Sequence, residues 1–127
     1  MRNSIYISAV LLAALSGTSC DHRQQAEEIA RATTGGSAAR GAAAIARYGC
    51  GSCHIIPGVS GASGLAGPPL SGIGNRIYIA GVLQNTPDNM IRWIQNPPGV
   101  DEHTVMPNLG VKRQDAIDIA GYLYTLK

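Results

Sequence analysis

The sequence predicts an all-α fold with three main helices joined by long loops. Three stretches carry apolar residues at helical spacing, and no stretch alternates apolar and polar residues as a half-buried strand does. The chain has 127 residues, enough for one domain with a short appendage. It contains no Phe and a single Trp, so bulky core side chains are scarce. We therefore expect a cofactor, a metal or disulfides to help fill the core.

The first 19 residues are typical of an export signal. Arg2 supplies positive charge, and residues 5–16 form an apolar run of 12 residues, whereas a membrane-spanning helix needs about 20. The run leads into LSGTSC, which resembles a bacterial lipoprotein processing site at which Cys20 becomes the first mature residue and carries the lipid. Ordinary cleavage nearby and an uncleaved anchor are the alternatives.

Residues 20–37 are predicted to form a flexible tether. The stretch is polar, has few apolar anchors and ends in the small-residue sequence TTGGS, although residues 24–32 could form a helix. The folded domain is then expected to cover residues 38–127.

The first main helix is predicted to lead directly into a pair of cysteines. One helical face carries small and apolar residues, namely Gly41, Ala44, Ile45 and Tyr48. Gly49 ends this pattern. Residues 55–75 are rich in glycine and proline and have no period, so they should form an irregular loop. A loop of about 20 residues is unusual in a compact domain, but it is reasonable where the loop wraps a cofactor.

Two more helices are predicted in the second half of the chain. Thr86 and Pro87 open one helix, and the sequence NPPG at residues 96–99 ends it. Residues 114–126 form the last helix, whose apolar face carries Ile119, Tyr122, Leu123 and Leu126. Its start lacks a side-chain cap, because Val111 and Lys112 offer no acceptor.

The sequence CGSCH at residues 50–54 is the clearest chemical motif. On a helical turn, cysteines three residues apart face the same side, and a histidine directly after the second stays on that side. Haem needs this set: two thiols for thioether bonds to its vinyl groups and an imidazole for its iron. We therefore predict one covalent haem c, attached through Cys50 and Cys53, with His54 as an axial ligand of the iron.

Three other kinds of site use paired cysteines. A structural zinc ion needs four ligands, and the missing ones would have to come from His103 and the distant Cys20. A thioredoxin-like dithiol expects a preceding strand and a parallel sheet, neither of which the sequence predicts. A structural disulfide makes no use of His54. Export from the cytoplasm also favours haem c, which is attached outside that compartment.

Met106 is the predicted second axial ligand. Pro107 favours extended backbone at Met106, which lets the thioether lie against a flat group, and His/Met ligation raises the reduction potential. Met90 lies one turn before Trp93, where a methionine usually fills the core. His103 would instead give a bis-histidine centre of lower potential. With both axial positions filled by the protein, only electron transfer remains, so we expect an electron carrier and not an enzyme.

Five stretches between residues 38 and 126 carry a family resemblance: GCGSCH, GPPLSGIGNR, NTPDNMIRWIQNP, MPNLGV and DIAGYLYTL. Through them the chain resembles the class I c-type cytochromes, in particular small bacterial monohaem proteins and the cytochrome c domain of haem-copper oxidase subunit II. The resemblance implies a cytochrome c fold, with three main helices and long loops wrapped around one covalently bound haem.

The resemblance also implies roles for three further cofactor-binding residues. The carbonyl of Pro68 would accept the free N–H of the His54 imidazole. Arg76 would lie near a haem propionate, and Trp93 would lie beside the haem. A solvated loop arginine and a core tryptophan are the alternatives for the last two.

The function implied is that of a one-electron carrier between respiratory complexes, from a donor complex to a terminal oxidase or reductase. The alternatives are a haem-bearing electron-transfer subunit of an oxidase or dehydrogenase complex, and a gas sensor in which Met106 leaves the iron. We expect the periplasmic side of the bacterial inner membrane, with a lipid anchor on Cys20, or otherwise a soluble periplasmic protein. The formal charge is only +2 and the Lys and Arg residues are dispersed, which argues against a nucleic-acid partner.

Overall fold

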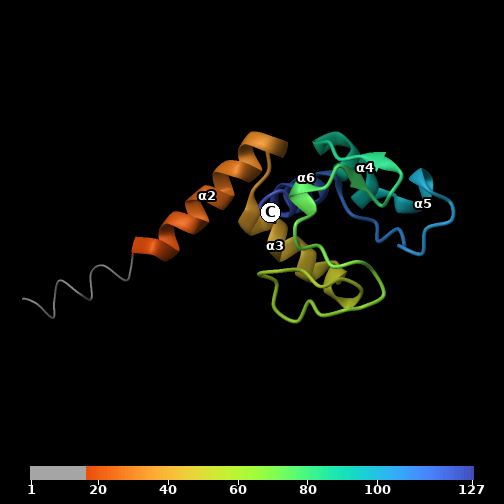
Figure 1. Cartoon of the computed structure of the whole chain (residues 1–127), viewed down its shortest axis with the longest axis horizontal. Coiled ribbons are helices and arrows are strands. Elements are labelled where there is room, and N and C mark those ends of the chain that lie inside the picture. The colour runs from red at the N-terminus through yellow and green to blue at the C-terminus, as the bar shows by residue number, and fades with distance from the viewer. Residues whose placement is uncertain (1–16) are drawn as a thin grey trace, which may run out of the picture.

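The computed structural model describes residues 17–127 (Figure 1). Within that range the chain forms five α-helices, two short 3₁₀ turns and one two-stranded sheet. Their order is α2 (Gly17–Thr34), α3 (Ala38–Arg47), η1 (Cys50–Ser52), η2 (Ile73–Asn75), β1 (Tyr78–Ile79), β2 (Leu83–Gln84), α4 (Pro87–Gln95), α5 (Pro97–Val100) and α6 (Arg113–Leu123). The export signal predicted for residues 1–19 lies, up to residue 16, outside the described residues.

The expected fold class, an all-α cytochrome c fold with three main helices, is wrong. Helices do occupy the three predicted places, as α3, α4 and α6, but α2 and α5 are additional helices, and β1 pairs with β2 in an antiparallel sheet. Each strand has two residues, too few to show alternation in the sequence. Between the strands, Ala80 and Gly81 both have positive φ, which turns the chain sharply.

The short helix α5 arises where the sequence predicts only a stop. Pro97 and Pro98 occupy its first two positions, where a missing N–H costs no hydrogen bond. The Asn96 side chain accepts a hydrogen bond from the Gly99 N–H at 3.3 Å and caps the turn. The same residues therefore end α4 and begin a further helical turn.

A helix also replaces the flexible tether that was expected over residues 20–37. The end of α2 packs against α6, where Ala30 is fully buried and a Cβ added at Gly121 would lie 3.0 Å from the Ala30 Cβ. The Thr34 hydroxyl donates to the Ile117 carbonyl at 3.0 Å. Small residues on both helices permit this close approach, so large apolar anchors are not required. Among residues 17–127, no helix combines the length and the hydropathy needed to cross a membrane.

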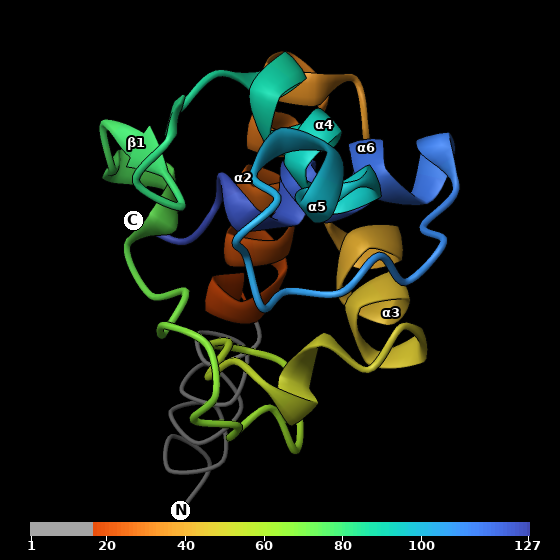
Figure 2. The same ribbon diagram turned by 90° about the vertical axis from the view of Figure 1, so that its right-hand side faces the viewer.

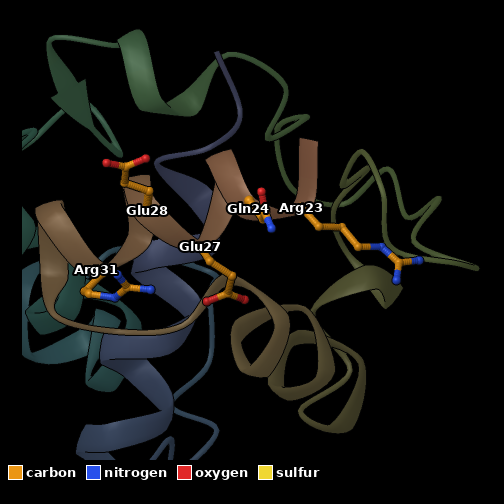
Figure 3. A pocket seen from close by; sticks show the side chains of 5 residues that line it. All are labelled: Arg23, Gln24, Glu27, Glu28 and Arg31. Atoms are coloured by element: carbon orange, nitrogen blue, oxygen red, sulfur yellow. The ribbon is translucent and has the colours of Figure 1, made fainter. Parts of the chain in front are cut away.

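The start of α3 is held by a carboxylate of α2. Glu27, one of the charged side chains of α2 shown in Figure 3, accepts hydrogen bonds from the N–H groups of Ala38 and Ala39 at 3.2 and 2.7 Å. It also accepts one from the Ser37 hydroxyl at 3.2 Å, and the same hydroxyl caps Arg40 N–H. A negative charge at a helix N-terminus is favourable, so Glu27 fixes the orientation of α3 relative to α2.

The helix α6 is the centre of the fold and contacts α2, α3 and α4 (Figure 2). Gly41 of α3 lets that helix lie against α6, since a Cβ there would clash with the Asp118 carbonyl. Asp118 is 2% exposed, and its carboxylate accepts hydrogen bonds from the Arg40 guanidinium at 2.8 and 3.0 Å and from the Ser37 N–H at 2.8 Å. The apolar core beside this contact includes Ile45, Met90, Ile91, Trp93, Ile94, Ile119 and Leu123.

Candidate functional site

The CGSCH motif forms a tight turn directly after α3. Gly49, with φ 72°, redirects the chain at the end of the helix, and the N–H groups of Cys53 and His54 both donate to the Cys50 carbonyl, at 3.2 and 3.1 Å. Both cysteines are half-buried and are not bonded to each other. The turn therefore has the local helical geometry from which the sequence predicts that Cys50, Cys53 and His54 share one side.

The Cys50 thiol is in an environment unlike that of a redox dithiol. Burial raises the pKa of Cys50, whereas the attacking cysteine of a C-x-x-C redox motif has a lowered pKa. The element before the motif is a helix and not the strand that a thioredoxin-like site requires. Among the described residues, no group of three or more His, Cys, Asp or Glu side chains could hold a metal ion.

The His54 imidazole is oriented by the Pro68 carbonyl. The distance from His54 Nδ1 to the Pro68 oxygen is 2.7 Å. A carbonyl oxygen only accepts hydrogen bonds, so Nδ1 carries the proton and donates. In the neutral imidazole the second ring nitrogen, Nε2, then keeps its lone pair, which is the form of histidine that binds a metal.

Backbone hydrogen bonds on both sides of His54 bring Pro68 into place. The Gly67 N–H donates to the Cys53 carbonyl at 2.7 Å, and the Leu70 N–H donates to the Ile55 carbonyl at 2.9 Å. The loop thus runs alongside the motif for several residues, with Pro68 between the two bonds. Gly67 packs against the imidazole itself, because a Cβ there would lie 2.7 Å from Nδ1 and 2.9 Å from Nε2 of His54.

Met106, the predicted second ligand, lies on the loop between α5 and α6. Its side chain is half-buried and packs against the apolar core, and its N–H donates to the Thr104 hydroxyl at 3.2 Å. In Figure 2 this loop passes in front of the helices, above the loop that follows His54. No hydrogen bond joins Met106 to the motif within the described residues, so its role as a ligand stays a prediction.

The rival candidates for the second ligand have other surroundings. Met90 is 2% exposed and lies in the core on α4. His103 is an exposed loop residue whose Nδ1 lies 3.7 Å from a carboxylate oxygen of Asp101. The structure therefore gives Met90 a packing role and places His103 in solvent.

Of the two other residues assigned to cofactor binding, Arg76 makes contacts that the sequence did not predict, and Trp93 has the core position given above as its alternative. Arg76 is exposed, and its guanidinium donates to the carbonyls of Pro69 and Ser71 at 2.6 and 3.1 Å, in the loop that carries Pro68. Trp93 is buried in the core on α4. Arg76 therefore binds backbone atoms here, and Trp93 packs among apolar side chains.

Sequence reasoning missed a polar cluster that joins the two ends of the candidate site. The Tyr48 hydroxyl, at the end of α3, donates to Asp115 at 2.8 Å and accepts from the Lys112 N–H at 3.3 Å. Arg47 pairs with the other Asp115 oxygen at 2.9 Å. The hydrogen bond from Tyr48, together with Arg47, lowers the pKa of Asp115. The cluster thereby ties the start of the cysteine motif to the end of the Met106 loop.

The residues present fit a covalently attached haem in their donor chemistry. Two half-buried thiols, an imidazole with Nε2 available and a nearby-loop thioether are the groups that haem c uses. Large apolar side chains stay exposed on the same two loops, with Leu65 84% and Val105 91% exposed. Covering exposed apolar side chains of this size with an apolar group is favourable, because it removes apolar surface from water.

Cys20, the predicted lipidation site, falls within α2, and its modification is a prediction that the described contacts do not test. The predicted boundaries at residues 19 and 37 likewise stay predictions. Two surface hollows lie apart from the CGSCH motif, one along α2 (Figure 3) and one between α4 and the start of α6. Neither is lined by a residue of the motif.

Comparison with known proteins finds similarity to an oxidase subunit. A segment of 79 residues, 61% of this chain, is 34% identical to cytochrome c oxidase subunit 2 of Alkalihalophilus pseudofirmus. The chain spans only 22% of the length of that protein. No family model and no solved structure matches the chain. The expected resemblance to subunit II of a respiratory oxidase is confirmed to this extent, as similarity to a part of that subunit.

Proposed function

We propose that this chain is a one-electron carrier that uses a single haem attached through Cys50 and Cys53. The observation that supports this best is the oriented His54 imidazole within a C-x-x-C-H turn. A histidine whose Nδ1 donates to a backbone carbonyl presents Nε2 in one tautomer and one direction. Such an arrangement is typical of a metal ligand and is not needed by a disulfide.

The chain's own residues would hold the group in the following way. The thiols of Cys50 and Cys53 would hold the group through thioether bonds, and Nε2 of His54 and the Met106 thioether would bind its iron. The bound iron supplies a one-electron redox couple. The exposed apolar side chains of the two loops would exclude water around the bound group, which would disfavour the more highly charged oxidised form. With both His54 and Met106 bound, the iron would have no position for a substrate, so we propose no catalytic reaction.

Similarity to an oxidase subunit 2 supports a role in respiratory electron transfer. We propose that the chain passes electrons from a donor complex to a terminal oxidase or reductase, as a class I c-type cytochrome does. The same similarity favours a second candidate, in which the chain is the haem-bearing electron-transfer subunit of an oxidase or dehydrogenase complex. Co-purification of a stable complex at stoichiometric amounts would favour the second candidate over the first.

A position on the periplasmic side of the inner membrane completes the proposal. Export allows covalent attachment of the haem, and a lipid on Cys20 would keep the carrier near membrane complexes. The variant Cys20→Ser should move the protein from the membrane fraction to the soluble periplasmic fraction. An unchanged membrane fraction, with a mature mass altered only by the exchange of sulfur for oxygen, would exclude the lipid.

The test of the main proposal is production of the full chain in a host that attaches c-type haem. We expect haem that stays bound to the chain under denaturing electrophoresis, and its loss in Cys50→Ala/Cys53→Ala. Spectroelectrochemistry should give one one-electron transition, whose potential falls in Met106→Ala because thioether ligation raises it. The matched control is Met90→Leu, which changes a core methionine and should leave ligation unaltered. A folded, colourless chain would refute haem binding.

A further inference from the structure

Arg76 holds the loop that carries Pro68. Its guanidinium donates hydrogen bonds to the carbonyl oxygens of Pro69 and Ser71 at 2.6 and 3.1 Å. These carbonyls follow Pro68 closely along the chain. The nitrogens of Pro68 and Pro69 carry no hydrogen, so this part of the loop has few donors of its own. Arg76 supplies contacts that the loop cannot make by itself.

The position of the Pro69 carbonyl affects that of the Pro68 carbonyl directly. The Pro69 ring fixes φ at about −65°, so only the ψ angle of Pro69 is free to rotate one carbonyl relative to the other. The backbone bonds on either side of His54 fix the ends of this short segment. A guanidinium bound to the Pro69 carbonyl therefore restrains the acceptor of the His54 Nδ1–H.

Arg76 is itself anchored to the core. Asn85 donates from Nδ2 to the carbonyls of Arg76 and Ile73 at 2.7 and 2.9 Å. The Asn85 Oδ1 accepts from the Tyr124 hydroxyl at 2.8 Å, and Tyr124, just after α6, is buried. A continuous series of hydrogen bonds thus runs from the end of α6 to the loop beside the imidazole.

We propose that Arg76 is a positioning residue for His54, acting through the backbone of Pro69 and Pro68. This assignment differs from contact with a haem propionate, which the family resemblance implies for Arg76. It deepens the proposed function and rests on it for the effect on the iron. The effect on the imidazole itself does not require haem.

The consequence for the metal has a definite sign. A firm Nδ1–H bond to a carbonyl makes Nε2 more basic and so stabilises the oxidised iron. Loosening the Pro68 carbonyl should therefore raise the reduction potential. Removal of a nearby positive charge would lower it instead, because the oxidised iron carries the larger positive charge. Both hydrogen bonds come from Nη2 of Arg76. The variant Arg76→Lys keeps the charge, but its ammonium nitrogen lies one bond nearer the backbone than Nη2, so it separates the two effects.

The experiment compares Arg76→Lys and Arg76→Gln with the parent full chain. The first measurement is NMR hydrogen exchange of the His54 Nδ1–H. We expect this exchange to be about tenfold faster in Arg76→Gln, the factor that corresponds to the loss of one ordinary hydrogen bond. The second is the reduction potential, expected to rise in Arg76→Lys. The control Arg92→Gln removes an exposed arginine of α4 and should change neither.

Two results would overturn the proposal. One is a hydrogen-exchange rate of the His54 Nδ1–H that equals the parent's in both Arg76 variants. The other is a changed potential in Arg76→Gln with unchanged exchange, which would assign Arg76 a purely electrostatic role. If no haem attaches to any variant, the proposed function fails, but the exchange rate of the haem-free chain still decides whether Arg76 positions His54. Circular dichroism of each variant checks that the fold is intact.

Discussion

Replacing Asp118 tests whether the contact between α3 and α6 depends on one buried carboxylate. Asp118 accepts the Ser37 N–H at 2.8 Å and two hydrogen bonds from Arg40. In Asp118→Ala the Arg40 side chain, which is 64% exposed, can be hydrated instead, so loss of the Arg40–Asp118 ion pair contributes little to the change in stability. The Ser37 N–H lies partly buried and loses its acceptor, which costs about 1 to 3 kcal/mol. We expect the free energy of unfolding to fall by about 2 kcal/mol.

Urea unfolding followed by circular dichroism measures this loss. Asp118→Asn keeps an oxygen acceptor for Ser37, so it should be less destabilising than Asp118→Ala. The exposed Asp88, in the first turn of α4, provides the matched control Asp88→Asn, which should cost about 0.5 kcal/mol or less. Equal losses in Asp118→Asn and Asp118→Ala would refute the role assigned to the Ser37 bond, as would a loss no larger than that of the control.

The same carboxylate predicts how stability depends on pH. Burial acts to raise the pKa of Asp118, but hydrogen bonds from Arg40 and Ser37 outweigh it, so the pKa is lowered. A lowered pKa stabilises the folded chain above the unfolded-state value, which is about 3.9, and this contribution is lost as pH falls through the folded-state value. The stability difference between the parent and Asp118→Asn should therefore be largest near neutral pH and shrink below about pH 4. A difference that does not change with pH would contradict this reasoning.

Three further variants test other contacts. Gly67→Ala should push the loop away from His54, because the new Cβ would clash with the imidazole, and the yield of covalently bound haem should fall relative to Ser60→Ala, an exposed position of the same loop. Tyr48→Phe removes the hydrogen bond to Asp115, so the pKa of Asp115 should rise toward its ordinary value, as carbon-13 NMR titration can measure. Ala30→Leu overfills the contact between α2 and α6 and should lower the melting temperature, whereas Ala32→Leu, on the exposed side of α2, should not.

Local signals in the sequence predicted the helices that depend on local contacts. Thr86 caps α4 by accepting the Asn89 N–H, and Pro87 takes its first position, as the sequence indicates. The start of α6 has no side-chain cap, also as expected. By contrast, α2 depends on Ala30 meeting Gly121, a contact between distant parts of the chain that the composition of residues 20–37 cannot reveal. The strands β1 and β2 are too short for periodicity to detect.

In the candidate site, too, features that depend on neighbouring residues were predictable from the residue pattern alone, and contacts between more distant residues were not. The turn of the CGSCH motif follows from five consecutive residues, and the contact between His54 and Pro68 agrees in geometry with what the family resemblance implies. The partners of Arg76 are backbone carbonyls, which leave no signature in a sequence. Met106 stays a prediction, because a ligand bond is formed only with the metal.

Because helix α2 is docked on the other helices, it forms a rigid connection between residue 20 and the core. From residue 21 to residue 34 the helix advances about 1.5 Å per residue, so its backbone spans roughly 20 Å as a rod. The end of α2 packs against α6, and the Glu27 carboxylate is hydrogen-bonded to the start of α3. The helix therefore reorients only together with the rest of the fold. A force applied near residue 20 is therefore transmitted to the core through a rigid helix. The cysteine motif keeps a fixed orientation relative to residue 20 instead of sampling all orientations.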